Sequence, residues 1–236
     1  MYKYIFIDLD DTLFDFQKSE HLSIQQLLSD YHLETSPEII QSYKTYNQSL
    51  WHQIEQGNLT KDQLLNTRFP GFFKSFDIEI SDGIAVDNQF RSYLVQNTFL
   101  LPDALTFLKT LKKHQFKLYA ASNGVYETQF HRLHLTEIYD LFDDYFISEK
   151  IGFAKPDPRF FTFAFNQLNI TDLSQVVMIG DSLSSDIQGA NNANIDVIWL
   201  NQQAKELPSS LKVIYQTSHL KDVMNYLIND NSSSLN

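Results

Sequence analysis

Residues 4–13 read Tyr4-Ile-Phe-Ile-Asp8-Leu-Asp10-Asp11-Thr-Leu13, a short apolar run that leads directly into three carboxylates. Apolar runs with similarly abrupt polar ends recur along the chain, at Lys117–Ala121, Val176–Ile179 and Val197–Leu200, with a weaker one at Phe146–Ile147. Runs of this length and character are typical of buried parallel strands, whose side chains are covered on both faces of the sheet.

Segments with helical spacing of apolar residues separate these runs, at Ala104–Lys113, Pro158–Leu168 and Ile187–Asn192. Alternation of strand and helix predicts an α/β fold, a doubly wound, Rossmann-like and mostly parallel sheet. Ligands of such sheets bind at the carboxyl ends of the strands. The polar residues that follow each apolar run are therefore the candidate site.

Residues 16–98 interrupt the alternation and predict an inserted all-helical domain. Ser36 and Pro37 mark the start of one helix, Thr60 with Gln63 forms a capping-box pattern, and a third helix is predicted over Gly83–Gln96. Apolar positions spaced by three and four define the inner face of the first of these helices, at Ile39, Tyr43, Tyr46, Leu50 and Ile54. The predicted core domain comprises 1–15 and 99–230, and 231–236 read as a flexible polar tail.

Composition limits the possible functions. The 236 residues include 18 Lys and Arg against 29 Asp and Glu, a net charge of −11, which disfavours binding to nucleic acid or to an anionic membrane. Cysteine is absent, so disulfides, thiolate metal sites and a Cys nucleophile are excluded. Without a signal-peptide pattern or a long apolar stretch, we expect a cytoplasmic protein.

The acidic run after the first strand is the first candidate site. Asp8 and Asp10 are two positions apart, so in extended backbone both side chains point to the same side. Two adjacent carboxylates suit a hard cation such as Mg²⁺, or a division of labour in which one attacks and the other carries a proton. The alternative is an acidic turn in which Asp11 caps the following segment.

The second candidate site is Ser122-Asn123-Gly124, at the end of the second core strand. A hydroxyl and exposed backbone N–H groups at a strand-to-helix junction would form a phosphate seat. A Ser N-cap followed by an Asn-Gly turn is the alternative interpretation.

Two further candidates lie nearer the C-terminus. Lys155 precedes a proline, which favours an extended loop from which its ammonium group could reach a phosphate and a carboxylate. Gly180-Asp181-Ser182 ends another strand, with Asp181 as a metal ligand and with Ser182 and Asp186 as supporting groups that orient waters or Lys155. The alternatives are a solvated surface lysine and a loop in which Asp186 caps a helix.

Together the four sites hold a nucleophile, a proton carrier, a metal seat and two groups that stabilise charge, as phosphoryl transfer requires. Their motifs, in this order, resemble those of the haloacid dehalogenase superfamily: Asp8-Leu-Asp10-Asp11-Thr12, Ser122-Asn123, Lys155-Pro156, and Gly180-Asp181-Ser182 with Asp186. The insertion resembles that superfamily's helical cap of the first (C1) type. The resemblance covers the whole chain.

The resemblance implies that Asp8 becomes an aspartyl phosphate and that Asp10, held by Thr12, protonates the leaving oxygen and later activates water. It also implies Mg²⁺ bound by Asp8, the Asp10 backbone carbonyl and Asp181. The phosphoryl oxygens would be surrounded by Ser122, Asn123, Gly124 and Lys155. Asp10 favours phosphate ester hydrolysis over dehalogenation, because an alkoxide leaving group needs a proton and a halide does not.

Residues 50–60 and 64–69 of the insertion resemble the pyrimidine 5′-nucleotidase branch, which implies a nucleoside monophosphate as the small-molecule substrate. Trp51, Gly57 and Asn58 are our candidates for reading that substrate, although Gly57 is equally well explained as a helix C-cap facing solvent. A phosphoglycolate-type or sugar-phosphate phosphatase or mutase remains an alternative. A phospho-accepting receiver module is disfavoured, because it needs neither Asp10 nor a lid. We expect a monomer or a weak homo-oligomer.

Overall fold

The computed structural model describes residues 1–233, with side chains described through residue 229. The chain divides into two compact units, a core unit of Met1–Asp15 with Leu100–Asn236 and a helical unit of Phe16–Phe99. In the described residues no helix is both long and apolar enough to cross a membrane.

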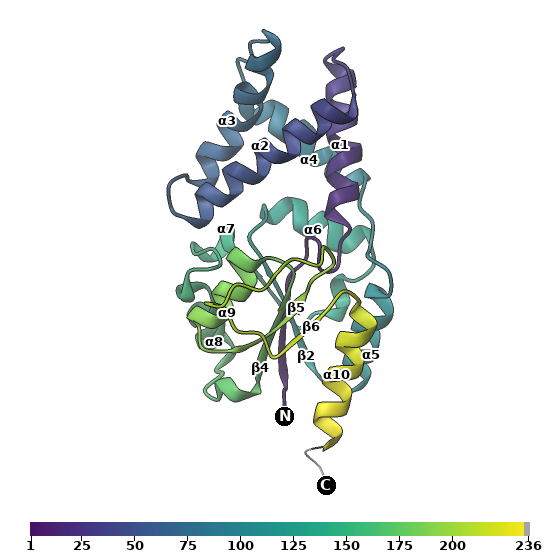
Figure 1. Ribbon diagram of the computed structural model, residues 1–236, viewed down its shortest axis with the longest axis vertical. Helices are drawn as coiled ribbons and strands as arrows, with labels where there is room; N and C mark the ends of the chain where they lie inside the picture. The colour runs from purple at the N-terminus through teal and green to yellow at the C-terminus, as the bar shows by residue number, and fades with distance from the viewer. Residues whose placement is uncertain (234–236) are drawn as a thin grey trace. The chain divides into compact units, whose positions relative to one another are not determined.

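The core unit is built on a parallel sheet, seen in the lower part of Figure 1. The strand order of the sheet is β3-β2-β1-β4-β5-β6. Its strands are β1 (Tyr4–Ile7), β2 (Lys117–Ser122), β3 (Asp144–Ile147), β4 (Val176–Gly180), β5 (Asp196–Leu200) and β6 (Tyr215–Thr217). In the register of the central strands, Ile5 lies beside Leu118 on one side and Val177 on the other. The prediction of a doubly wound α/β fold is therefore confirmed.

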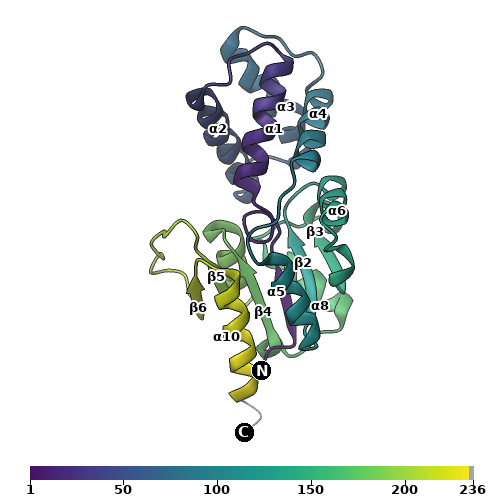
Figure 2. The ribbon, with the colours of Figure 1, turned by 90° about the vertical axis from the view of Figure 1, so that its right-hand side faces the viewer.

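Helices cover both faces of the sheet, and successive side chains of each strand point to opposite faces. Ile5 and Ile7 join the apolar cluster of α5 (Ala104–Lys113) and α10 (Leu220–Ser233), which lie side by side in Figure 2. Phe6, between them in sequence, packs against α8 (Pro158–Leu168) on the other face. The continuous apolar runs in the sequence reflect this two-sided burial.

The structure extends the sequence-based assignment in several places. It adds α6 (Tyr126–Leu135), α7 (Ser148–Ile151), the edge strand β6 and α10, and three 3₁₀ turns at Lys74–Phe76, Tyr139–Leu141 and Leu173–Gln175. The helix expected over Ile187–Asn192 is a π-helical turn, Leu183–Ile187, followed by α9 (Gln188–Asn192). Helix α10 continues through residue 233, so residues 231–233 of the expected tail are helical, and 234–236 lie outside the described residues.

The helical unit consists of α1 (Phe16–Asp30), α2 (Pro37–Glu55), α3 (Lys61–Phe73) and α4 (Gly83–Gln96). The predicted caps are present: the Ser36 hydroxyl accepts from Ile39 N, and Thr60 and Gln63 form the reciprocal capping box. Helix α1, which Asp15 directly precedes, is not among the helices that the sequence analysis predicts individually.

Aromatic side chains fill the interior of the helical unit. Tyr43, Phe69 and Phe90 are fully buried, with the rings of Tyr43 and Phe69 stacked at 5.7 Å. Trp51, the aromatic residue among our candidates for substrate contact, is not part of this core and is only partly buried. Most of the aromatic content of the insertion is therefore structural.

Candidate active site

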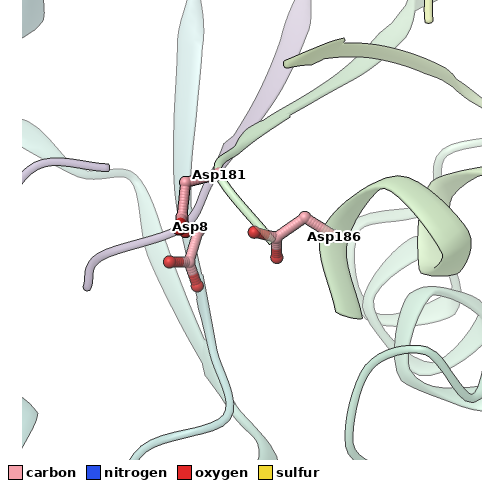
Figure 3. Close-up of side chains that lie close together, drawn as sticks. All are labelled: Asp8, Asp181 and Asp186. Atoms are coloured by element: carbon pink, nitrogen blue, oxygen red, sulfur yellow. The ribbon is translucent and has the colours of Figure 1, made fainter. Parts of the chain in front are cut away.

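The order of the strands reverses between β1 and β4, and this is where parallel sheets bind ligands. Asp8 follows β1 and Asp181 follows β4, and the Asp8 backbone N–H extends the ladder by donating to Ile179 O at 2.9 Å. Carboxylate oxygens of Asp8, Asp181 and Asp186 lie within 4.8 Å of one another (Figure 3). Two predicted motifs, 173 positions apart at Asp8 and Asp181 (181 − 8), are thus brought together.

Lys155 enters this group from the loop before α8. Its Nζ donates to Asp8 Oδ1 at 2.7 Å, to Asp186 Oδ1 at 2.6 Å and to the Ala121 carbonyl at 2.5 Å. The side chain is only 1% exposed, so the interpretation of Lys155 as a solvated surface lysine is wrong. An ammonium group has three protons, and all three are used here.

Burial and neighbouring charge shift the pKa values in this group. Burial raises the pKa of Asp8 well above its usual range, Asp186 and Asp10 raise it further, and Lys155 opposes them. The pKa of Asp181 is raised in the same way by burial and by Asp186 and Asp8. Burial lowers the pKa of Lys155, but the carboxylates of Asp186 and Asp8 outweigh it and the pKa is raised. One ammonium group among several carboxylates leaves the site short of positive charge.

The donor atoms fit a hard divalent cation. Asp8 Oδ2 and both carboxylate oxygens of Asp181 accept no hydrogen bond from any residue that the structure describes. Asp186 is already engaged, because its Oδ1 accepts from Lys155 and its Oδ2 accepts from Ser182 N at 3.1 Å. Mg²⁺ prefers oxygen ligands from one or two carboxylates, and Asp8 and Asp181 could provide them. Asp186 is suited to a supporting role.

Gly180 makes room for this arrangement. A Cβ atom at Gly180 would lie 2.2 Å from Asp186 Oδ2, closer than any real contact allows. Ser182 caps the π-helical turn that carries Asp186, accepting from Ser185 N at 3.3 Å, so Asp186 is not itself the cap. The fully buried Trp199, which sequence reasoning missed, donates from its indole N–H to the Asp181 carbonyl at 2.9 Å.

The Ser122-Asn123-Gly124 turn lies at the end of the neighbouring strand β2. The Ser122 hydroxyl accepts from Gly124 N at 3.0 Å, whereas the Asn123 amide is paired with the backbone of Lys155. Asn123 Nδ2 donates to Lys155 O at 2.7 Å, and Asn123 Oδ1 accepts from Lys155 N at 2.9 Å. Asn123 therefore positions Lys155, and the Ser122 hydroxyl donates its own proton to no residue that the structure describes, so both residues stay candidates for phosphate binding.

The Asp10 carboxylate is bound by two residues of α6 that the sequence analysis did not identify. Gln129 Nε2 donates to Asp10 Oδ2 at 2.6 Å, and Arg132 Nη1 donates to Asp10 Oδ1 at 2.5 Å. The Thr12 hydroxyl, predicted to hold Asp10, is buried and has no hydrogen-bond partner among the described residues. The only available signal was the i, i+3 spacing of Gln129 and Arg132 on the helix that follows the Ser122-Asn123-Gly124 turn.

The remaining candidates belong to the helical unit. Gly57 follows the end of α2 with φ +74°, and its N–H donates to Ile54 O at 2.9 Å, which is the geometry of a helix C-cap. Asn58 is exposed and donates to Gln56 Oε1 at 3.1 Å, and the Lys61 ammonium lies 6.0 Å from the centre of the Trp51 ring. These residues stay candidates for substrate recognition.

Comparison with known proteins gives concordant results. Residues 2–194 match the family of haloacid dehalogenase-like hydrolases. The chain is 36% identical over 230 residues to the pyrimidine 5′-nucleotidase PynA of Streptococcus pneumoniae, covering 96% of this chain and 95% of that protein. It is 31% identical over 220 residues to the pyrimidine 5′-nucleotidase YjjG of Escherichia coli, covering 93% and 95%. The crystal structure of Bacillus subtilis YfnB bound to magnesium matches with a TM-score of 0.88 at 33% identity, covering 96% and 98%.

Proposed function

Because the chain belongs to the haloacid dehalogenase-like hydrolase family, we propose that it is a Mg²⁺-dependent phosphatase that acts through an aspartyl phosphate. Its proposed substrate is a small phosphomonoester, specifically a pyrimidine nucleoside 5′-monophosphate. The observation that carries the proposal is the placement of Asp8 at the strand-order reversal. Lys155 binds one of its oxygens there and leaves the other without a partner among the described residues.

The first half of the reaction transfers the phosphoryl group to the protein. A carboxylate oxygen of Asp8 forms a bond to phosphorus as the bond from phosphorus to the 5′ oxygen breaks, and Asp10 gives that oxygen a proton. Lys155 and the Ser122 hydroxyl are placed to stabilise negative charge on the phosphoryl oxygens. Mg²⁺, held by Asp8, Asp181 and the Asp10 carbonyl, would neutralise charge on the phosphoryl group.

The second half releases phosphate. Asp10, now a carboxylate, takes a proton from a water molecule as the water oxygen bonds to phosphorus and the bond to Asp8 breaks. Inorganic phosphate leaves, and both aspartates return to their starting states. An acid two residues after the nucleophile is needed for an ester and not for a halide, so Asp10 supports ester hydrolysis over dehalogenation.

The nucleotide preference is supported by the two pyrimidine 5′-nucleotidases that match nearly the whole chain at 36% and 31% identity. The match includes the helical unit, because it covers 96% and 93% of this chain. Trp51, Gly57 and Asn58 are our proposed reading residues, and we propose a monomer or a weak homo-oligomer.

The test is phosphate release from a panel of nucleoside 5′-monophosphates, sugar phosphates and p-nitrophenyl phosphate, with Mg²⁺ present. We expect continuous turnover, with pyrimidine nucleotides preferred, and no turnover by Asp8→Asn, because an amide cannot attack phosphorus. Asp103→Asn makes the same chemical change at an exposed aspartate of the core unit and should be fully active. Substantial turnover by folded Asp8→Asn would contradict the assignment of Asp8 as the nucleophile. A preference for sugar phosphates would contradict the assignment of a nucleotide as the substrate.

A further inference from the structure

Gln129 and Arg132 form a hydrogen-bonded clamp around Asp10. Each Asp10 oxygen accepts from one of them, and the two are tied together because Arg132 Nη1 also donates to Gln129 Oε1 at 2.9 Å. The contacts join residues 119 and 122 positions apart in the chain. Asp10 is therefore held from the side of α6, not by its own loop.

The hydrogen bonds of the clamp allow only one orientation of the Gln129 side-chain amide. Both protons of the Gln129 amide are used, one on Asp10 Oδ2 and one on Ser122 Oγ at 3.0 Å. Its oxygen accepts from Arg132, so exchanging the oxygen and nitrogen of the amide would break all three bonds. Each Asp10 oxygen still has a lone pair that can carry a proton.

The clamp is built from buried parts. Gln129 is 2% exposed and Arg132 is 1% exposed, whereas the Asp10 side chain they hold is 30% exposed. The Arg132 guanidinium group packs on the Phe14 ring at 4.2 Å, and a Cβ atom at Gly124 would lie 2.6 Å from Gln129 Nε2. At 30% exposure, water alone could solvate the Asp10 carboxylate. Burying the charged Arg132 side chain to bind that carboxylate costs desolvation free energy, so the arrangement is not explained by folding stability alone.

Gln129 also fixes the direction in which the Ser122 hydroxyl can donate its proton. Ser122 Oγ accepts from Gln129 Nε2 and from Gly124 N, and it donates to no residue that the structure describes. With two donors on its oxygen, the hydroxyl proton is directed to another acceptor, such as a phosphoryl oxygen. One amide thus orients both Asp10 and the Ser122 hydroxyl.

We propose that Gln129 and Arg132 are positioning residues that hold Asp10 for its two proton transfers, with Gln129 also aligning the Ser122 hydroxyl. The inference rests on the proposed phosphatase function. Beyond that function, it assigns the orientation of the Asp10 carboxylate to two residues of α6 that belong to none of the four sequence motifs.

The test compares Gln129→Leu, Arg132→Met and Arg132→Lys with the wild type on a nucleotide and on p-nitrophenyl phosphate. On the nucleotide we expect kcat to fall about 10- to 100-fold with KM changed less than about 3-fold, because proton transfer fails while binding persists. With p-nitrophenyl phosphate, whose leaving group needs no proton, we expect a burst of about one nitrophenol per enzyme and then slow turnover. Arg132→Lys should be faster than Arg132→Met and slower than wild type, since lysine keeps the positive charge but lacks the planar guanidinium group that donates to Asp10 and Gln129 together.

Gln167→Leu and Arg159→Met are the matched controls, because each removes the same kind of bond to a carboxylate at an exposed place on α8. Both should retain wild-type kinetics. A double-mutant cycle completes the test with Arg132, whose Nη1 protons go to Asp10 and Gln129 and not to Ser122: in an Asp10→Asn background, Arg132→Met should lower kcat less than about 3-fold further. Equal losses on both substrates without a burst, or a full additional loss in the Asp10→Asn background, would mean that the clamp acts only on folding. Wild-type kinetics in the clamp variants would overturn the clamp alone, whereas an active Asp8→Asn would overturn the phosphatase mechanism itself.

Discussion

Lys155 Nζ and Asp186 Oδ1 form a buried ion pair 2.6 Å apart, with each side chain only 1% exposed. Asp186 in turn accepts from Ser182 N, and Lys155 also binds Asp8, so the pair fixes the orientation of the proposed nucleophile. A buried pair of this kind is costly to break, because the remaining charge loses both water and its partner.

Lys155→Met should therefore lower both stability and activity. Removing the ammonium group leaves the carboxylates of Asp8 and Asp186 close together without a counter-charge, so we expect a loss of about 3–5 kcal/mol in the free energy of unfolding. Turnover should fall at least about 100-fold, because the phosphoryl oxygens lose a cation. Urea unfolding at neutral pH measures the first effect, with Lys109→Met, an exposed lysine of α5, as control. Unchanged stability would contradict the ion pair.

Mg²⁺ should stabilise the protein, and more strongly as pH rises. The pKa values of Asp8 and Asp181 are raised well above 3.8, so the folded metal-free protein holds protons that the unfolded chain has lost. Its stability therefore falls as pH rises from the unfolded pKa to the raised folded pKa, where both carboxylates have ionised. Cation binding favours the ionised carboxylates, so the gain in Tm from Mg²⁺ should grow over the same range.

Thermal unfolding in Mg²⁺ or in chelator, from about pH 5 to about pH 8, measures this difference. Asp181→Asn should lose most of the gain, and activity should disappear in chelator. Ca²⁺ should restore little activity, because it accepts looser geometry than in-line transfer requires. An equal Mg²⁺ effect in Asp181→Asn would place the cation elsewhere, and full turnover in excess chelator would refute the metal requirement.

Asp143→Asn tests an ion-pair cluster of the core unit away from the site. Burial raises the pKa of Asp143, but bonds from Lys112, Leu118 N and Lys117 outweigh it and the pKa is lowered. A lowered folded pKa contributes stability above the unfolded pKa that is lost as pH falls through the folded pKa.

We expect Asp143→Asn to cost about 1 kcal/mol at neutral pH, and the difference from wild type to vanish in acid. Denaturant unfolding at several pH values measures it. Asp140→Asn, at an exposed aspartate nearby in sequence, is the matched control and should unfold at the same denaturant concentration as wild type at neutral pH. Turnover should be unchanged in both variants, and a cost that persists at acid pH would show that the charge is not responsible.

Substitution in the helical unit should change substrate choice. If Trp51 and Asn58 read the base, then Trp51→Ala and Asn58→Ala should change the ranking among nucleotides and leave p-nitrophenyl phosphate turnover within about 3-fold. Relative kcat/KM values over the nucleotide panel measure the ranking. Proportional losses on every substrate would mean that these residues support the fold of the unit and do not contact the base.

Local sequence patterns predicted much of this molecule because the relevant physics is local. An apolar run that ends at Asp8 or Asp181 marks the end of a buried strand, and Thr60 with Gln63 marks a helix start, within a few residues of chain. The three-residue edge strand β6 had no comparable signal, since Tyr215–Thr217 is too short to show a period and is only partly buried.

The sequence by itself thus determined the strands of the sheet other than β6, the strand ends that carry Asp8 and Asp181, and the helical nature of residues 16–98. Only the tertiary structure decided that Lys155 is buried between Asp8 and Asp186, and that Asp10 is held by Gln129 and Arg132 rather than by Thr12. These contacts join residues 31 to 147 positions apart. Such pairings depend on which side chains the packing of strands and helices brings together, and no local period or cap in the sequence encodes that.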